Sequence, residues 1–206
     1  MRDEKTKAGF VAVIGAPNAG KSTLVNHLVG FKVSIVTHKV QTTRTRIRGV
    51  CMHGASQIIF VDTPGIFEPK RKLDRAMVDA AWLGADDADL IIFLYDVTRR
   101  EVDSDTSRIL SGLKENNKEA ILVLNKIDLV KSELLLPITK RFQEENIFSD
   151  TFMVSAENGS GCEKLLEYLS VRIPDSPWLY PEDEVSDLPQ RLLAAEITRE
   201  QVLLKL

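Results

Sequence analysis

A glycine-bounded loop near the amino terminus constrains the fold of this chain more than any other feature. An apolar run over residues 10–14 precedes the loop, and a segment with apolar residues at helical spacing follows it and ends at Gly30. A strand, a glycine loop and a helix in this order bind phosphate, because successive N–H groups and the helix N-terminus point at the anion. The loop consists of Gly15, Ala16, Pro17, Asn18, Ala19, Gly20, Lys21 and Ser22.

Two side chains at the end of this loop have specific predicted roles. Lys21 is expected to reach the β- and γ-phosphates of a nucleotide, and the Ser22 hydroxyl to hold Mg²⁺. Thr23, the next residue, is included among the predicted nucleotide-binding positions. The alternative is a chance glycine turn with a surface lysine, but the strand before the loop and the helix after it favour phosphate binding.

Composition bounds the remaining possibilities. The chain has 206 residues, 44% of them hydrophobic, which allows one well-buried domain and a short piece of a second. The formal net charge of −3 provides no global basic field for nucleic acid. Cys51 and Cys162 lie far apart without metal-ligand spacing, which favours reduced cytosolic thiols. Because no apolar run approaches the roughly 20 residues that span a bilayer, neither membrane spanning nor secretion is expected.

Strand-like and helix-like patterns alternate along the chain. Residues 47–52 and 56–61 predict an antiparallel hairpin, residues 90–95, 120–124 and 151–154 predict further strands, and residues 73–81, 103–113 and 165–173 predict helices. A further helix reaching about residue 145 starts at Pro137 or at Ser132. The pattern predicts an α/β fold: a mostly parallel six-stranded sheet with one antiparallel edge strand and helices on both faces. Ligands of such sheets sit beyond the carboxyl ends of the strands.

A carboxylate motif follows the predicted strand at 56–61. It consists of Asp62, Thr63, Pro64 and Gly65. Asp62 can hold Mg²⁺ through a water, and the Gly65 N–H can contact a γ-phosphate. The same four residues alone are an equally good turn signal, but their distance after a phosphate loop favours the metal site.

A second motif follows the strand at 120–124 and has the properties of a guanine reader. Asp128 can accept from the ring N–H and the exocyclic amine of guanine, an arrangement that adenine lacks. The stem of Lys126 is expected to cover the base, and Asn125 to tie this segment to the phosphate loop. A polar turn that opens a helix is the alternative. Backbone amides at Ser155 and Ala156, after the last strand, are expected to meet the guanine oxygen.

These motifs together resemble the Era family within the translation-factor class of GTPases. The resemblance rests on the loop at 15–22, Gln41-Thr42-Thr43-Arg44, Asp62-Thr63-Pro64-Gly65, Asn125-Lys126-Ile127-Asp128 and Ser155-Ala156-Glu157. The tail, from Tyr180-Pro181-Glu182-Asp183 through Glu196-Ile197-Thr198-Arg199-Glu200, resembles the linker and first helix of the family's KH RNA-binding domain. MnmE and Der share the nucleotide motifs, whereas residues 41–44 and the tail favour Era.

The resemblance carries further expectations. It implies a P-loop GTPase fold with a GTPase domain over residues 1–175, and a linker with the first helix of a truncated KH domain over residues 176–206. It implies Mg²⁺, GTP and GDP as ligands, and binding to small-subunit ribosomal RNA and the ribosomal subunit, mainly through the missing part of the KH domain. In this family, one threonine of the loop at 37–46 closes over Mg²⁺ when GTP is bound. Thr43 is favoured for this role, and Thr42 is the alternative. A cytoplasmic location is implied, with peripheral association at the inner membrane left open.

Hydrolysis is expected to be slow. Many GTPases place a glutamine directly after the glycine of the Asp62 motif to orient water, but this chain has Ile66 there, which cannot act as a base. In relatives with an asparagine at position 18, K⁺ sits beside the phosphates, so Asn18 is predicted to help bind K⁺. The alternative for Asn18 is a loop-shaping residue bonded to its own backbone. The residues assigned to catalysis are Lys21, Thr43, Gly65 and Asn18.

Three functional classes are compatible with these motifs. The first is a Mg²⁺-dependent GTPase switch in ribosome biogenesis, in which segments 37–46 and 62–72 are ordered by the γ-phosphate. The second is a nucleotide-gated binding module with negligible hydrolysis of its own, or a related GTPase of tRNA modification or ribosome assembly. A nucleotide kinase is disfavoured because no second-substrate lid is recognisable.

The basic loops and the tail leave alternatives open. Lys39, Arg44, Arg46, Arg48, Lys70, Arg71 and Lys72 either contact RNA or form solvated faces. Pro189 is expected to open a helix through Leu192, Leu193, Ile197 and Leu204. These leucines are expected to be exposed and sticky, unless the helix folds back on the GTPase domain.

Overall fold

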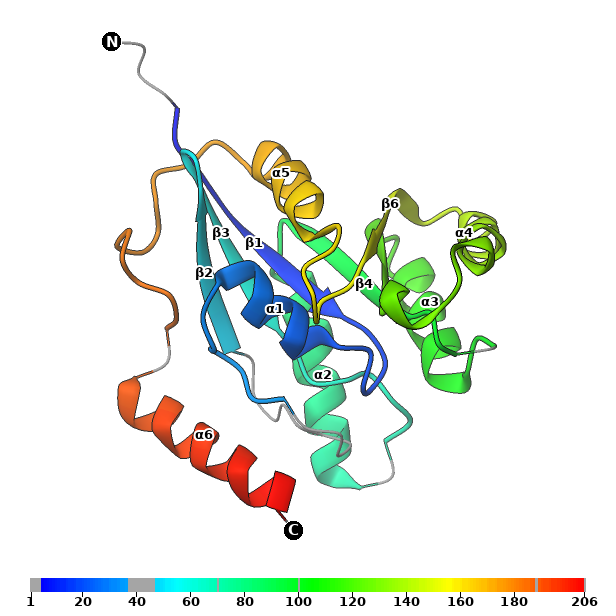
Figure 1. Cartoon of the computed structure of the whole chain (residues 1–206), viewed down its shortest axis with the longest axis horizontal. Helices are drawn as coiled ribbons and strands as arrows, with labels where there is room; N and C mark the ends of the chain where they lie inside the picture. Colours follow the sequence, from blue (N-terminus) through cyan, green and yellow to red (C-terminus); the bar gives the residue numbers. More distant parts are fainter. Residues whose placement is uncertain (1–4, 37–46, 70, 100, 188, 206) are drawn as a thin grey trace.

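The computed structural model describes residues 5–36, 47–69, 71–99, 101–187 and 189–205, which form one six-stranded sheet in the order β2-β3-β1-β4-β5-β6 (Figure 1). β2 and β3 are antiparallel, and all other neighbouring strands are parallel. The expected mostly parallel sheet with one antiparallel edge strand is therefore confirmed. The strands are β1 (Lys7–Ile14), β2 (Ile47–His53), β3 (Ser56–Asp62), β4 (Leu90–Asp96), β5 (Ala120–Asn125) and β6 (Phe148–Val154).

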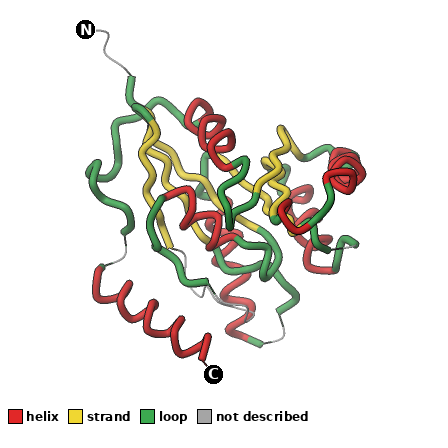
Figure 2. Tube along the Cα trace, in the orientation of Figure 1, coloured by secondary structure: helices red, strands yellow, loops and turns green. Residues whose placement is uncertain are grey.

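Helices cover both faces of this sheet, as expected (Figure 2). Val11 and Val13 of β1 pack into a core with α1 (Lys21–Val29) and α5 (Cys162–Arg172). Ala12 and Ile14 point to the opposite face, where they pack with α2 (Lys72–Asp86), α3 (Ser104–Glu115) and α4 (Leu135–Gln143). Successive side chains of a strand alternate between faces, so a continuous apolar strand serves both cores.

Parallel pairing brings the carboxyl ends of five strands to one edge of the sheet. Asp62 at the end of β3 lies opposite Val13, and Asp96 at the end of β4 lies opposite Asn125 at the end of β5. Asn125 in turn lies opposite Val154 at the end of β6. The segments that follow these strands therefore meet beside the loop that follows β1, where such sheets bind ligands.

Two boundaries differ from the sequence expectation. β6 begins at Phe148 rather than at residue 151, because Ala120 pairs with Phe148 across a register shift that no local pattern announces. Ser132 and Pro137 each contribute to the start of α4. Ser132 opens a 3₁₀ turn that ends at Leu134, and Pro137 lies in the first turn of α4, where its missing N–H costs little.

The linker, defined here as residues 176–187, packs along the antiparallel edge of the sheet. The Val50 N–H of β2 donates to the Val185 carbonyl over 2.9 Å. Gln57 of β3 is fully buried; its amide oxygen accepts from the N–H groups of Leu179 (2.8 Å) and Tyr180 (2.9 Å), and its amide nitrogen donates to the Tyr180 carbonyl (2.8 Å). The linker thus packs on the sheet and covers part of the outer edge of β2, which has no neighbouring strand in the described sheet.

Helix α6 (Gln190–Lys205) follows the linker and lies at the lower left of Figure 1. The Glu200 carboxylate is 2% exposed; it pairs with the Lys32 ammonium group and accepts the Val36 N–H over 2.8 Å. Leu192 and Val202 are each 49% exposed. Among the described side chains both expectations are partly met: Glu200 docks the helix on residues 32–36 through polar groups, while Leu192 and Ile197 stay exposed. The side chains of Leu193 and Leu204 lie outside the described part of the structure. The boundary at residue 175 stays a prediction.

Gln57→Ala should lower the free energy of unfolding by about 1 to 3 kcal/mol, because it removes the hydrogen bonds that hold the linker. Limited proteolysis should then cut residues 176–187 faster than in the wild type. Gln143→Ala, at the exposed end of α4, is the matched control. Equal cleavage and unfolding of the two variants would contradict this role of Gln57.

Candidate functional site

The loop between β1 and α1 has the conformation expected of an anion site. Gly20 has φ +96°, and Asn18 has φ +62°, a left-handed conformation that asparagine adopts more readily than most residues. The N-terminus of α1 has no side-chain cap and no acidic residue in its first turn. Its N–H groups and the positive end of the helix dipole therefore fit a phosphate group. Within the described residues, the Asn18 side chain makes no hydrogen bond, so the bond to its own backbone that the alternative interpretation requires is not seen.

Lys21 is buried against the same loop. Its ammonium group donates to the carbonyls of Gly15 (3.2 Å) and Ala16 (3.1 Å). Burial lowers the pKa of Lys21 to about 8, while Asp62 opposes this shift and Arg99 adds to it. The protein thus holds a poorly solvated cation beside the loop, as a site for phosphate requires.

Hydroxyl and carboxylate oxygens converge next to Lys21. The Ser22 hydroxyl donates to Asp62 Oδ2 over 2.7 Å, and the Ser34 hydroxyl donates to the same oxygen over 2.5 Å. Asp62 is fully buried at the end of β3. Such hard oxygen donors suit Mg²⁺, which takes one or two protein oxygens together with phosphates and waters. The described residues contain no cluster of three or more His, Cys, Asp or Glu side chains, and this donor set does not need one.

The segment after Asp62 packs against the phosphate loop. The Thr63 hydroxyl donates to the Val13 carbonyl (2.8 Å), and the Ile66 N–H donates to the Gly15 carbonyl (3.2 Å). Gly65 lies so close to Pro17 that an added Cβ would come within 3.1 Å of it. Ile66 is fully buried, so its apolar side chain does not reach the site. Thr42 and Thr43 lie outside the described residues, and the choice between them stays open.

Asn125 joins the predicted base site to the phosphate loop. Its side chain is 1% exposed; the amide nitrogen donates to the Ala19 carbonyl over 2.9 Å, and the amide oxygen accepts the Ala156 N–H over 3.0 Å. An added Cβ at Gly20 would lie 2.4 Å from this amide, so Gly20 permits the close approach. One side chain thus fixes three loops relative to one another.

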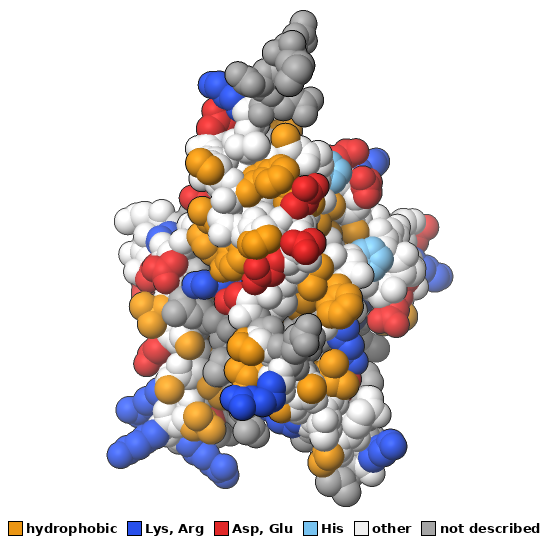
Figure 3. Space-filling model, turned by 90° about the vertical axis from the view of Figure 1, so that its left-hand side faces the viewer, with side chains coloured by type: hydrophobic (Ala, Val, Ile, Leu, Met, Phe, Trp, Pro, Cys, Tyr) orange, Lys and Arg blue, Asp and Glu red, His pale blue; other side chains and the backbone are white. Residues whose placement is uncertain are grey.

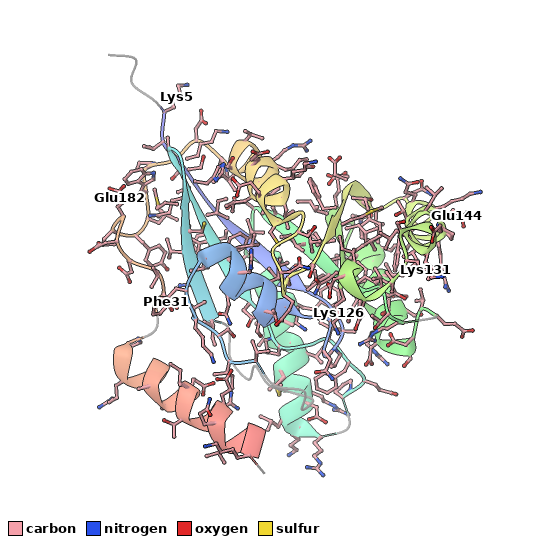
Figure 4. The ribbon with its side chains drawn as sticks, viewed as in Figure 1. Lys5, Phe31, Lys126, Lys131, Glu144 and Glu182 are labelled. Atoms are coloured by element: carbon pink, nitrogen blue, oxygen red, sulfur yellow. The ribbon has the colours of Figure 1, made fainter. Side chains whose placement is uncertain are left out.

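Lys126 lies beside Asn125 in a left-handed conformation with φ +67°, and Figure 4 labels it near the N-terminus of α1. Its ammonium group donates to the Asn18 carbonyl (3.0 Å) and pairs with Asp96 Oδ2 (2.6 Å). Asp128 is exposed in the 3₁₀ turn Ile127–Leu129. The Asp128 carboxylate is therefore accessible to a ligand, two residues after Lys126, whose ammonium group is bound to the phosphate loop.

The Ser155–Ala156 segment is more engaged than the sequence suggested. The Ser155 N–H donates to the Ser160 carbonyl (2.9 Å), and the Ala156 N–H is taken by Asn125. Their predicted contact with a guanine oxygen stays a prediction.

Sequence reasoning missed three residues of this site: Ser34, Asp96 and Arg99. Asp96 carried a usable signal, because a carboxylate at the carboxyl end of a predicted parallel strand is a candidate ligand position. Ser34 and Arg99 carried none, since each reaches the site from a loop that lacks a motif.

Comparisons with known proteins agree with this geometry. The family model described as "50S ribosome-binding GTPase" matches residues 10–126. The chain is 59% identical over 201 residues to the GTPase Era of Rhizobium meliloti (strain 1021), covering 98% of this chain and 64% of that protein. It is 54% identical over 214 residues to the GTPase Era of Caulobacter vibrioides, covering 98% and 68% of the two chains. The chain thus spans about 64% of the length of the first of these relatives.

Solved structures give the same picture. Era in complex with MgGDPNP and nucleotides 1506–1542 of 16S ribosomal RNA superposes with a TM-score of 0.88 at 41% identity, covering 95% of this chain and 66% of that one. A variant of Aquifex aeolicus Era bound to GDP.AlF4− gives a TM-score of 0.87 at 41% identity, with the same coverage. The bacterial elongation factor EF-Sec, at 20% identity and a TM-score of 0.64, shares the fold.

Asn125→Ala should weaken GDP binding on the order of tenfold, because about 1.4 kcal/mol of lost loop organisation corresponds to that factor. It should also lower the free energy of unfolding by about 1 to 3 kcal/mol, since the Ala156 N–H and Ala19 carbonyl lose a buried partner. Titration of fluorescent GDP and urea unfolding measure the two effects. Asn116→Ala, at the far end of α3, is the control, and equal GDP affinities would refute the bridging role.

Proposed function

Since the chain belongs to the Era family of GTPases, we propose that it binds GTP and GDP with Mg²⁺ and hydrolyses GTP slowly as a molecular switch. The observation that carries this proposal is the Asn125 amide, which holds the phosphate loop and the base segment in one frame. A site built this way reads the base and the phosphates of the same ligand. A phosphate loop alone would not discriminate between bases.

The phosphate half of the proposed site uses the loop at 15–22. The N–H groups at the start of α1 and the Lys21 ammonium group would bind the β- and γ-phosphates, and the Gly65 N–H would contact the γ-phosphate. Ser22, Asp62 through a water, and Thr43 would hold Mg²⁺, which supplies positive charge to the phosphate oxygens when bound. Ser34 shares Asp62 Oδ2 with Ser22 and thereby orients this carboxylate.

The base half uses the segment after β5. Asp128 would accept the guanine ring N–H and exocyclic amine, and adenine would leave this carboxylate unpaired. The Lys126 stem would cover the base while its head stays on Asp96 and the Asn18 carbonyl. This division of one side chain between packing and charge is common for lysine.

Slow hydrolysis follows from what surrounds the γ-phosphate position. Ile66 occupies the position of the water-orienting glutamine of other GTPases and is fully buried in the core. Positive charge from K⁺ bound beside Asn18 would then replace part of the help that a glutamine gives in other GTPases. The Asn18 side chain is exposed and makes no hydrogen bond to another described residue, which is compatible with that role. The alternative is a nucleotide-gated binding module whose hydrolysis needs a partner, and the buried Ile66 favours it.

The proposed output is binding of small-subunit ribosomal RNA during ribosome maturation. Support comes from the Era structure that contains a 16S ribosomal RNA fragment. We assign residues 1–175 to the GTPase domain and residues 176–206 to the linker and first helix of a KH domain. On the face shown in Figure 3, Lys and Arg side chains gather at the lower end, at the level of α2 and α6. A local gathering of positive side chains can bind RNA phosphates even though the net charge of the chain is slightly negative.

The switch would act through segments 37–46 and 62–72. Glu200 of α6 holds the Val36 N–H, directly before the first of these segments. The cytoplasm is the proposed location, with peripheral membrane association as the alternative. None of the helices in the described ranges is long and apolar enough to cross a bilayer.

Purified chain with Mg²⁺ should hydrolyse GTP faster in K⁺ than in Na⁺, by a factor on the order of ten, because a bound cation stabilises charge in the transition state. Multiple-turnover phosphate release measures both rates. Lys21→Ala should abolish turnover, and Asn18→Ala should remove the difference between the salts. Equal wild-type rates would refute the K⁺ role, and tight GTP binding without turnover would favour the gated module.

A further inference from the structure

Arg99 connects the loop after β4 to the phosphate loop. Its Nη2 donates to the carbonyl oxygen of Pro17 over 2.6 Å, although the two residues are 82 positions apart. Its Nη1 pairs with the Asp103 carboxylate, and the Arg99 side chain is only 22% exposed. The guanidinium group thus bridges the start of α3 and the loop at 15–22.

The surroundings hold this guanidinium group in place. Asp103 caps α3 by accepting the Thr106 N–H over 2.8 Å. Burial alone would raise the pKa of Asp103, but hydrogen bonds from Thr106 and the charge of Arg99 bring it below the usual value, so the ion pair persists at neutral pH. The Arg99 N–H donates to the Asp96 carbonyl (3.2 Å), and the Arg99 carbonyl accepts the Tyr95 hydroxyl (3.4 Å). The arginine is therefore presented from a rigid frame.

The bond to Pro17 fixes the orientation of one peptide group. The Pro17 carbonyl and the Asn18 N–H belong to the same planar trans peptide, so they point in opposite directions. Arg99 holds the carbonyl on its own side and thereby turns the Asn18 N–H away from α3. A flipped peptide would direct a carbonyl oxygen, instead of a hydrogen-bond donor, at a bound phosphate.

The same peptide lies inside a turn, in which the Ala19 N–H donates to the Ala16 carbonyl over 3.3 Å and Asn18 has φ +62°, a conformation that asparagine tolerates at this turn position. Arg99 adds a constraint from outside this turn. Lys126 holds the next carbonyl, that of Asn18, over 3.0 Å. Cations from the ends of two neighbouring strands, β4 and β5, thus hold successive carbonyls of the loop. Lys126 belongs to the base segment, whereas the described contacts of the Arg99 side chain are with Pro17 of the phosphate loop and with Asp103 of α3.

We propose that Arg99 is a positioning residue for GTP hydrolysis, which holds the Pro17–Asn18 peptide with its N–H aimed at the phosphates. The inference rests on the proposed function, because it requires a nucleotide in this loop. A fixed donor stabilises charge that develops in the transition state more than charge already present in the product. Loss of Arg99 should therefore affect hydrolysis and transition-state mimics much more than GDP.

The test compares Arg99→Gln with Arg172→Gln, which removes an arginine charge from the end of α5, where the Arg172 guanidinium group lies 3.5 Å from the Asp150 carboxylate. Arg99→Lys keeps the charge but loses the forked geometry. Asp103→Asn keeps a good helix cap and the bond to Pro17 while removing the ion pair. For each variant, the melting temperature, kcat and KM for GTP with Mg²⁺, and the Kd values of GDP and of GDP with aluminium fluoride are measured.

Arg99→Gln should lower kcat and the affinity for GDP with aluminium fluoride on the order of 10- to 100-fold, less than deletion of a donor outright. Its affinity for GDP should change by less than about threefold, and Arg172→Gln should match the wild type. Arg99→Lys should fall between Arg99→Gln and the wild type, and Asp103→Asn should lose less than Arg99→Gln.

Two results would overturn the proposal while leaving the GTPase function intact. One is an unchanged ratio of the two affinities in Arg99→Gln. The other is a loss of GDP affinity and melting temperature in step with kcat, which would make Arg99 merely structural. If wild-type turnover is too slow to measure, the affinity ratio alone decides. Failure of the wild type to bind GDP would instead overturn the proposed function, and this inference with it.

Discussion

The buried amide of Asn125 is the interaction on which the site depends. It joins the loops after β1, β5 and β6 by two hydrogen bonds of 2.9 and 3.0 Å. Each of these loops could adopt other conformations alone, because loops carry few apolar contacts of their own. A buried amide that loses one partner leaves a polar group unpaired, so the three loops are stable only together. The sheet below them supplies the geometry, since parallel pairing places all three loop starts at one edge.

Motif reasoning predicts the parts of the site that lie directly after strands. The loop at 15–22 and the segments at Asp62, Asn125 and Ser155 all lie at the carboxyl edge, because a buried apolar strand followed by polar residues is visible locally. The alternation of patterns likewise predicts the sheet and its two helical layers. These features depend on residues close together in the sequence.

Contacts between distant segments escaped prediction. The sequence around Ser34 or Arg99 shows no pattern that places either near Asp62 or Pro17. The docking of the linker on Gln57 depends on where a chain segment 122 residues away returns to the sheet. The start of β6 depends on pairing with β5, which compensates for polar residues at its beginning. Each of these features is determined by tertiary contacts, which local sequence propensity does not predict.

The phosphate loop is supported from several sides. Asn125, Lys126 and Arg99 donate hydrogen bonds to the carbonyls of Ala19, Asn18 and Pro17, and the Ala19 N–H closes a turn on the Ala16 carbonyl. The buried Glu200 connects α6 to the segment before residues 37–46 by an ion pair with Lys32 and by a hydrogen bond from the Val36 N–H. The phosphate and base segments are therefore joined directly to each other, and α6 is joined to the segment that leads into residues 37–46.

Base selectivity tests most directly whether one site binds both the guanine base and the phosphates of a nucleotide. Calorimetric titration with Mg²⁺ should show GDP binding at least about 10³-fold more tightly than ADP, because adenine leaves Asp128 unpaired. Asp128→Asn should bind GDP more weakly and xanthosine diphosphate more tightly, because the exocyclic C2 oxygen of xanthine accepts a hydrogen bond from the new amide N–H. Equal affinities for GDP and ADP, or an Asp128→Asn variant with unchanged preference, would contradict the account.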